Sequence, residues 1–230
     1  MSSQSHAYER CRAFIDSNFV ESSPLAEEAP ITLTLSRQAF SKTHAIAESL
    51  IKRLDTDSSL GQRKWALFDR NLVHKILEDH DLPDRLAKYM PEDRDREFTG
   101  AINEILGVHP SLWKLFHYTC DTIQKLAKVG NVVLIGRGAH IISRGMPNVL
   151  HVRIIAPFEL RVQRAAQMLD ITHTEAGKRI RQDDQARAAF VRSHFDEPLE
   201  DPYAYDLVLN TASIDTNMAA DILFKALKCR

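Results

Sequence analysis

The residues best suited to chemistry lie in one short run near the N-terminal third of the chain. Ser36, Ser41, Lys42 and Thr43 have the spacing of a phosphate-binding loop, G-x-x-x-x-G-K-[ST], with serine at both glycine positions. Such a loop, between a strand and a helix, directs backbone N–H groups and the positive helix end at an anion. The lysine would reach the β- and γ-phosphates of ATP, and the hydroxyl after it would ligate Mg²⁺. The candidate ATP-binding residues are Ser36, Arg37, Gln38, Ser41, Lys42 and Thr43, with Lys42 catalytic and Thr43 the metal ligand.

The absence of glycine from this run supports a different interpretation. Glycine adopts a positive φ without cost, whereas a serine forced into the left-handed region costs about 1–2 kcal/mol. No glycine occurs from Ser36 through Thr43, and Phe40 is bulky. Taken alone, the run is equally compatible with an ordinary strand–turn–helix unit that carries a solvated lysine.

Two further candidate groups follow apolar runs that read as buried strands. Arg137 lies between two glycines directly after residues 131–135, where its guanidinium would offer a planar fork to a phosphate. An arginine at this place would equally serve to pair with a carboxylate at the end of the sheet. Asp69 and Arg70 follow residues 65–68, and they would either contact a substrate or make local caps and salt bridges.

The segment after residues 149–155 is rich in arginine. Arg161 and Arg164 are candidates for a mobile lid that stabilises the transferring phosphoryl group and excludes water. Asp184 and Arg187 are three residues apart, so they share a helix face and would hold one polar ligand together. The alternative is a solvated helix with ion pairs worth about 0.2–0.5 kcal/mol each.

The pattern of strands and helices predicts how these residues are brought together. Short apolar runs at 31–35, 65–68, 131–135, 149–155 and 206–210 alternate with helical segments, and no hairpin is evident. This order is typical of a doubly wound parallel sheet in three layers. Ligands of such folds bind at the carboxyl ends of the strands, where the candidate residues lie.

Composition narrows the classes of function. The chain has 230 residues, with 30 Lys and Arg against 31 Asp and Glu, so overall charge offers no case for nucleic acid or a membrane surface. Cys11, Cys120 and Cys229 are far apart and read as free thiols of a reducing compartment. No apolar run approaches the roughly 18–20 residues that span a bilayer. We therefore expect a cytoplasmic protein with no metal site built from protein ligands alone.

Several segments together resemble the cytidylate kinase-like family, within the P-loop nucleoside monophosphate (NMP) kinases. They are ITLTLSRQ and AIAESL between residues 31 and 50, FDRNLV at 68–73, NVVLIGRGAHII at 131–142, PNVLHVRIIAPFELRVQR at 147–164, the Asp184-x-x-Arg187 pair, and YDLVLNT at 205–211. The resemblance implies a three-layer P-loop kinase fold with a five-stranded parallel sheet over residues 31–230. It also implies a helical NMP-binding insert at about 70–128 and an arginine-rich lid at about 161–190. Residues 1–30 are expected to form a peripheral helix and linker.

The resemblance implies transfer of the ATP γ-phosphoryl group, with Mg²⁺, to CMP, dCMP or a similar small acceptor. Catalytic roles then fall to Lys42, Arg137, Arg161 and Arg164, and acceptor binding to Asp69, Arg70, Arg137, Asp184 and Arg187. The implied partners are nucleotides, with neither nucleic acid nor membrane, and a homo-oligomer is possible.

Two departures from the family pattern leave an alternative open. Phe40, Lys42 and Thr43 replace glycines of the S-R-Q-x-G-x-G-G loop, and Gly138 stands where cytidylate kinases have an aspartate. A catalytically silent nucleotide-binding or regulatory protein that retains the fold is the alternative.

Overall fold

The computed structural model describes residues 30–57, 64–69 and 112–230, with backbone only at 112–115. The predicted N-terminal helix, Arg70 and most of the predicted insert lie outside the described residues. The described elements are β1 (Thr32–Arg37), α2 (Thr43–Leu54), β2 (Ala66–Phe68), α5 (Leu112–Val129), β3 (Val132–Ile135), α6 (Ala139–Ile142), β4 (Val149–Ile155), α7 (Phe158–Leu169), α8 (His173–Phe195), the 3₁₀ helix η4 (Pro202–Ala204), β5 (Leu207–Asn210) and α9 (Thr216–Lys228).

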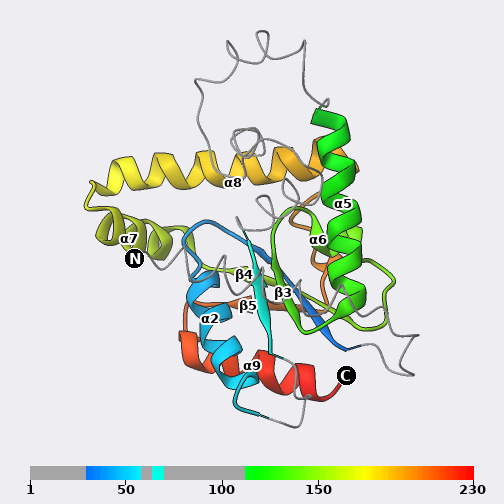
Figure 1. Ribbon diagram of the computed structural model, residues 1–230. Coiled ribbons are helices and arrows are strands. Elements are labelled where there is room, and N and C mark those ends of the chain that lie inside the picture. The colour runs from blue at the N-terminus through cyan, green and yellow to red at the C-terminus, as the bar shows by residue number, and fades with distance from the viewer. Residues whose placement is uncertain (1–29, 58–63, 70–111) are drawn as a thin grey trace, which may run out of the picture.

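The five strands form one sheet in the order β2-β3-β1-β4-β5, and every pair is parallel. β1 is the central strand, with Leu35 opposite Ile135 of β3 and Arg37 opposite Ile154 of β4. All four residues of β3 are buried, as expected for a parallel strand covered on both faces. The predicted doubly wound architecture is confirmed, and helices cover both faces of the sheet (Figure 1).

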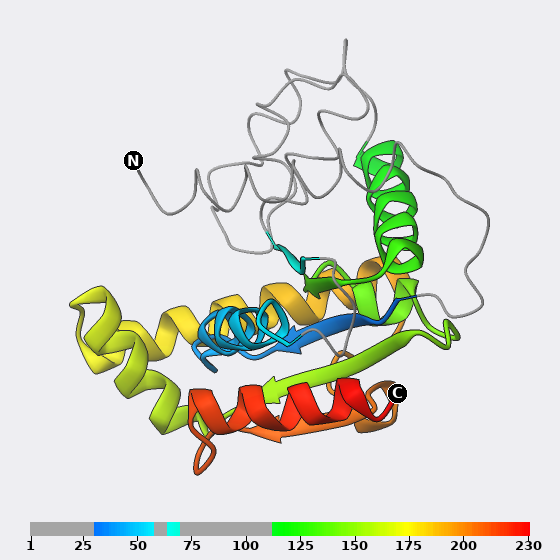
Figure 2. The same cartoon turned by 60° about the horizontal axis from the view of Figure 1, so that its bottom comes forward.

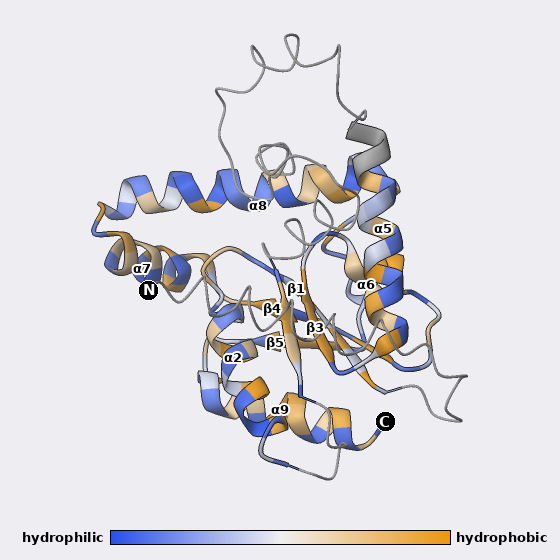
Figure 3. Ribbon diagram, in the orientation of Figure 1, coloured by the Kyte–Doolittle hydropathy of each residue, from blue (hydrophilic) through white to orange (hydrophobic). Residues whose placement is uncertain are grey.

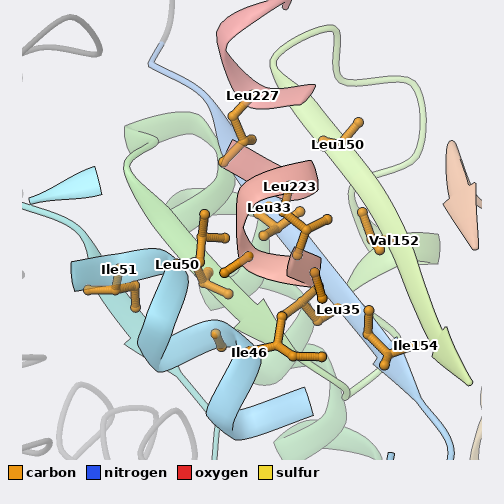
Figure 4. Close-up of a cluster of buried hydrophobic side chains, with 14 of the residues drawn as sticks. Leu33, Leu35, Ile46, Leu50, Ile51, Leu150, Val152, Ile154, Leu223 and Leu227 are labelled. Atoms are coloured by element: carbon orange, nitrogen blue, oxygen red, sulfur yellow. The ribbon is translucent and has the colours of Figure 1, made fainter. Parts of the chain in front are cut away.

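One face of the sheet packs against α2 and α9 through an apolar core. Leu33 and Leu35 of β1 point into this core, where they meet Ile46 and Leu50 of α2 and Leu223 of α9 (Figure 4). Leu33 and Leu35 are two residues apart on a strand, and Ile46 and Leu50 are four residues apart on a helix. Each pair therefore lies on one face of its element, and that face is the buried one. On α9, Met218 lies outside this core and is 51% exposed.

The opposite face of β1 is polar yet buried. Thr32 donates to the carbonyl of Ala127 in α5 at 3.2 Å, and Thr34 Oγ1 lies 2.8 Å from His151 Nδ1. Buried hydroxyls are tolerated here because each has a hydrogen-bond partner. The next residue on this face is Ser36, at the carboxyl end of the strand.

α7 and α8 form an antiparallel pair beyond the carboxyl ends of the strands. In Figure 2 the arrowheads of β1, β4 and β5 point toward the side where α7 lies. The pair is held by a small cluster of Val162, Ala165, Ala176 and Ile180, to which Ala39 of the β1–α2 loop also belongs. Apart from these cluster residues, the half of α8 that lies next to α7 is largely hydrophilic (Figure 3). None of the helices in the described ranges has the length and hydropathy needed to cross a bilayer.

Candidate active site

The β1–α2 loop has the strain that its lack of glycine predicts, but not at the serines. Phe40 and Lys42 have φ of 57° and 66°, and Lys42 is the left-handed N-cap of α2. Ser41 is buried, and its hydroxyl donates to the carbonyl of Gln38 at 2.8 Å and lies 2.9 Å from Thr43 Oγ1. Positive φ at non-glycine residues is costly, so the surrounding contacts must hold this conformation.

Those contacts come from two neighbouring elements. The amide of Gln38 donates to Ile154 O at 3.1 Å, and its side-chain oxygen accepts from Ala156 N at 3.0 Å. Phe40 packs against the apolar cluster of α7 and α8. The phenylalanine therefore lies under the α7–α8 pair, and Lys42 is exposed at the start of α2.

The carboxylate of Asp184 is bound to the loop. It accepts a hydrogen bond from Ala39 N at 2.7 Å, from Arg161 Nη1 at 2.5 Å and from Arg187 Nη1 at 3.4 Å. Arg161 is itself buried and also donates to the carbonyls of Ala156 and Ala39. The loop thus offers a backbone N–H to an anionic group, and that group here belongs to α8.

A small pocket, with about 20 Å³ of space for the centres of water-sized groups inside an opening of about 320 Å³ that includes solvent, lies beside the loop at the ends of β1 and β3. Three arginines from separate elements line it: Arg37 of β1, Arg137 after β3, and Arg187 of α8. Its other lining residues are Ser36, Gly136, Gly138, His140, Phe190, Val191 and Leu199, and none of the described lining residues is a carboxylate. Arginine side chains are suited to bind an anionic group.

The backbone at Arg137 is unusual. Gly136, Arg137 and Gly138 have consecutive φ values of 78°, 56° and 70°, and the Arg137 side chain is almost completely buried. A Cβ added to Gly138 would lie 2.3 Å from Cε2 of Phe195. Phe195 in turn packs edge-on against Phe116 of α5, with ring centroids 5.5 Å apart. The aspartate that the family resemblance leads us to expect at this place would therefore require Phe195 to move.

The remaining predicted site residues lie in different surroundings. Asp69 pairs with Arg37 at 3.9 Å and is hydrogen-bonded to His44 Nε2. Arg164 donates to the carbonyl of Thr211 at 2.7 Å and to its hydroxyl at 3.0 Å, and that hydroxyl donates to Ser41 O at 3.3 Å. Arg164 thus contacts the loop through Thr211, and burial lowers the pKa of its guanidinium.

Several pocket residues were not predicted from the sequence. From the sequence His140 is expected to be a surface or strand-end residue, but it is 4% exposed, and Phe190, Val191 and Leu199 carried no expectation. Phe190 and Val191 lie three and four residues after Arg187, so helical spacing from that arginine was the one signal that pointed to them.

A model of the cytidylate kinase-like family matches residues 32–213. The chain belongs to this family. Membership supports phosphoryl transfer of the nucleotide-kinase type in general, and the predicted P-loop kinase fold is confirmed.

One solved structure shares the fold at low sequence identity, and a second is a weaker match. An uncharacterized protein from Eubacterium ventriosum is 17% identical, with a TM-score of 0.64 over 87% of this chain and 99% of that one. A shikimate kinase from Bacteroides thetaiotaomicron is 12% identical, with a TM-score of 0.47 over 86% of this chain and 98% of that one. No curated protein matches the sequence.

Proposed function

We propose that this chain transfers the γ-phosphoryl group of ATP, with Mg²⁺, to CMP, dCMP or a similar small phosphorylated acceptor. The observation that carries the proposal is the pocket at the strand ends, where Arg37, Arg137 and Arg187 converge beside the β1–α2 loop. Phosphoryl transfer requires little covalent chemistry from a protein, so positioning and charge stabilisation suffice.

The donor phosphates would bind at the loop. The contact between Ala39 N and the Asp184 carboxylate supports this, because it is a backbone N–H of the loop bonded to an anionic group. Lys42 is exposed at the N-terminus of α2, where a lysine would reach the β- and γ-phosphates. ATP binding would displace Asp184 from Ala39 N.

The residues present fit Mg²⁺ through a hard oxygen ligand. Thr43 is the first residue of α2, and its hydroxyl lies beside Ser41 at the helix N-terminus. This hydroxyl would hold the ion together with phosphate oxygens, as magnesium prefers. The bound ion would neutralise charge between the β- and γ-phosphates.

The acceptor would lie in the pocket. Arg137 and Arg187 would bind its phosphate, and Phe190 and Val191 would contact its body. When ATP binds, the Arg161 guanidinium would exchange its bond to Asp184 for a bond to the transferring phosphoryl group. It already lies at the loop, where it donates to the carbonyl of Ala39. Arginines placed in this way stabilise the charge of the transition state.

A panel assay with ATP-Mg²⁺ and CMP, dCMP, UMP or AMP tests the proposal. We expect turnover with at least one pyrimidine acceptor, and Lys42→Ala should lower kcat by about 100-fold or more because it removes a charge that acts on the transferring phosphates. Arg137→Ala should chiefly raise the acceptor KM.

Lys52→Ala is the matched control, because Lys52 is exposed further along α2 and away from the loop. It should leave both constants unchanged. Turnover that survives Lys42→Ala would contradict the assignment of the loop.

A catalytically silent nucleotide-binding protein is the second candidate, and the Asp184 contact with Ala39 N is the observation that favours it. In a silent protein the lid carboxylate would remain on the loop. Calorimetric titration with ATP and CMP separates the two: binding of either nucleotide without any product supports the silent protein.

A further inference from the structure

The hydroxyl of Tyr205 connects several walls of the pocket from behind. Tyr205 follows η4, is 8% exposed and is not itself among the lining residues. Its Oη lies 2.8 Å from Leu199 O, 3.1 Å from Ser36 Oγ and 3.2 Å from His140 Nε2. All three of these partners line the pocket, and they come from three separate parts of the chain.

Arg153 completes the network from β4. Its Nη1 donates to Ser36 Oγ at 3.0 Å and to Tyr205 Oη at 3.5 Å, and its guanidinium lies 5.6 Å from the Tyr205 ring centroid. The ring of His140 stacks on that of Tyr205 with centroids 4.8 Å apart. Burial lowers the pKa of His140 to about 3, so this histidine is neutral at physiological pH and adds no charge to the network.

Counting protons determines what Ser36 can do. A serine hydroxyl has two lone pairs and one proton. When Tyr205 donates its single proton to Ser36 Oγ, and not to Leu199 O or His140 Nε2, Tyr205 and Arg153 together occupy both lone pairs. The Ser36 proton is then left for a partner on the pocket side.

The single phenol proton of Tyr205 can also go to the carbonyl of Leu199, in which case Ser36 would donate back to the phenol oxygen. An anion in the pocket favours the arrangement in which Tyr205 donates to Ser36 and Ser36 donates to the anion. The reason is that a hydrogen bond to an ionised acceptor is roughly twice as strong as one between neutral groups.

We propose that Ser36 donates a hydrogen bond to the anionic group bound by the pocket arginines, and that Tyr205 is the positioning residue that fixes Ser36 as a donor. The proposal assigns Ser36 to the acceptor side, whereas its place in the loop spacing predicts the donor side. It rests on the proposed function only in taking the ligand as the phosphorylated acceptor. The anion site itself is testable without turnover.

The test uses Tyr205→Phe, which removes one oxygen and keeps the ring on His140 and Arg153. With inorganic phosphate as the probe in isothermal titration calorimetry, we expect Ser36→Ala to weaken binding about 10-fold and Tyr205→Phe about 3- to 10-fold. Because Tyr205 acts through Ser36, the double variant should bind no more weakly than Ser36→Ala. Tyr203→Phe is the matched control, since Tyr203 is 96% exposed two residues away, and it should bind phosphate as the unsubstituted chain does.

Steady-state kinetics then separates positioning from general damage. Tyr205→Phe should raise the KM of the acceptor about 3- to 10-fold and leave the KM of ATP and kcat within about twofold. Equal phosphate affinity in all variants, additive losses in the double variant, or a matching rise in the KM of ATP would each overturn the inference. If the unsubstituted chain binds phosphate in this Ser36-dependent way but turns over no acceptor, the proposed function fails and the anion site stands.

Discussion

At the scale of single residues, part of the backbone strain lies where ligands are proposed to bind, although Asn131, Asp170 and Asp196 also have positive φ elsewhere. Phe40, Lys42 and Arg137 all have positive φ without being glycine. Each is held by its surroundings, as when Phe40 packs under α7 and α8. Such conformations persist when the neighbouring structure over-determines them, and they are frequent at ligand sites.

Lys42 allows strain to be measured separately from chemistry. Since Lys42 is the left-handed N-cap of α2, we expect Lys42→Gly to be more stable than Lys42→Ala by about 1 kcal/mol, because glycine adopts positive φ without cost. Both variants should lose turnover equally. Urea unfolding gives the difference in free energy.

The same pair of substitutions at Lys52, in the last turn of α2, should give the opposite sign, with alanine more stable by up to about 1 kcal/mol. Equal stability of the two Lys42 variants would mean that the left-handed N-cap carries no strain.

At the scale of elements, the carboxylate of Asp184 binds α8 to the β1–α2 loop, in addition to the apolar contacts of Ala39 and Phe40. Asp184 links Ala39 N to Arg161 of α7 and to Arg187, which lines the pocket. A helix attached in this way shares its charged residues between the loop and the pocket. Nucleotide binding and the position of α8 should therefore be coupled.

Asp184→Ala tests this coupling. Removing the carboxylate frees Ala39 N for a phosphate, so we expect ATP to bind about 3- to 10-fold more tightly. It also leaves the buried Arg161 without this partner, so the free energy of unfolding should fall by about 1–3 kcal/mol. Calorimetry and urea unfolding measure the two effects.

Glu175→Ala is the control on the same helix, since Glu175 belongs to the capping box at the start of α8. It should lower stability by about 1 kcal/mol and leave ATP affinity unchanged. Weaker ATP binding by Asp184→Ala would show that Asp184 supports the nucleotide site instead of competing for it.

At the scale of the whole molecule, cationic groups gather on the polar side of the sheet. His140 lies among them, and burial, followed by the nearby charges of His151, Arg144 and Arg153, lowers its pKa to about 3. Burial also lowers the pKa of His151. Both histidines are neutral in the folded chain over a pH range in which an unfolded chain would protonate them.

The stability of the fold should consequently fall in mild acid. Between the ordinary histidine pKa of 6.5 and about 3, the unfolded chain binds a proton at His140 that the folded chain does not, so the free energy of unfolding decreases as pH falls. The contribution approaches about 1.4 kcal/mol per pH unit. Urea unfolding between pH 5 and 8 should show a shallower slope for His140→Gln, whereas His173→Gln, at an exposed position, should keep the original slope. An unchanged slope in His140→Gln would contradict the assignment.

The five strands and the fold class followed from the sequence because their signals are local, whereas the order of the strands in the sheet did not. Residues 131–135 are apolar without alternation, and this pattern predicts a parallel strand that is buried on both faces. The loop spacing and the arginine between two glycines were readable for the same reason, since each is a property of a few consecutive residues. The strain expected of a glycine-free loop lies at Phe40 and Lys42, two of the positions where the family pattern has glycine, and not at the serines.

What only the tertiary structure decided is which side chains meet. Ser36 reads as a loop residue, yet strand alternation and packing place it on the polar face of β1, against Arg153 and Tyr205. Asp184 and Ala39 are 145 residues apart, and no local pattern relates them. Periodicity records which face of an element is buried, whereas partners across the sheet are chosen by the packing of all elements at once. For this chain, therefore, the sequence alone determined an α/β kinase architecture with ligands at the strand ends, and the folded structure decided which residues form the pocket.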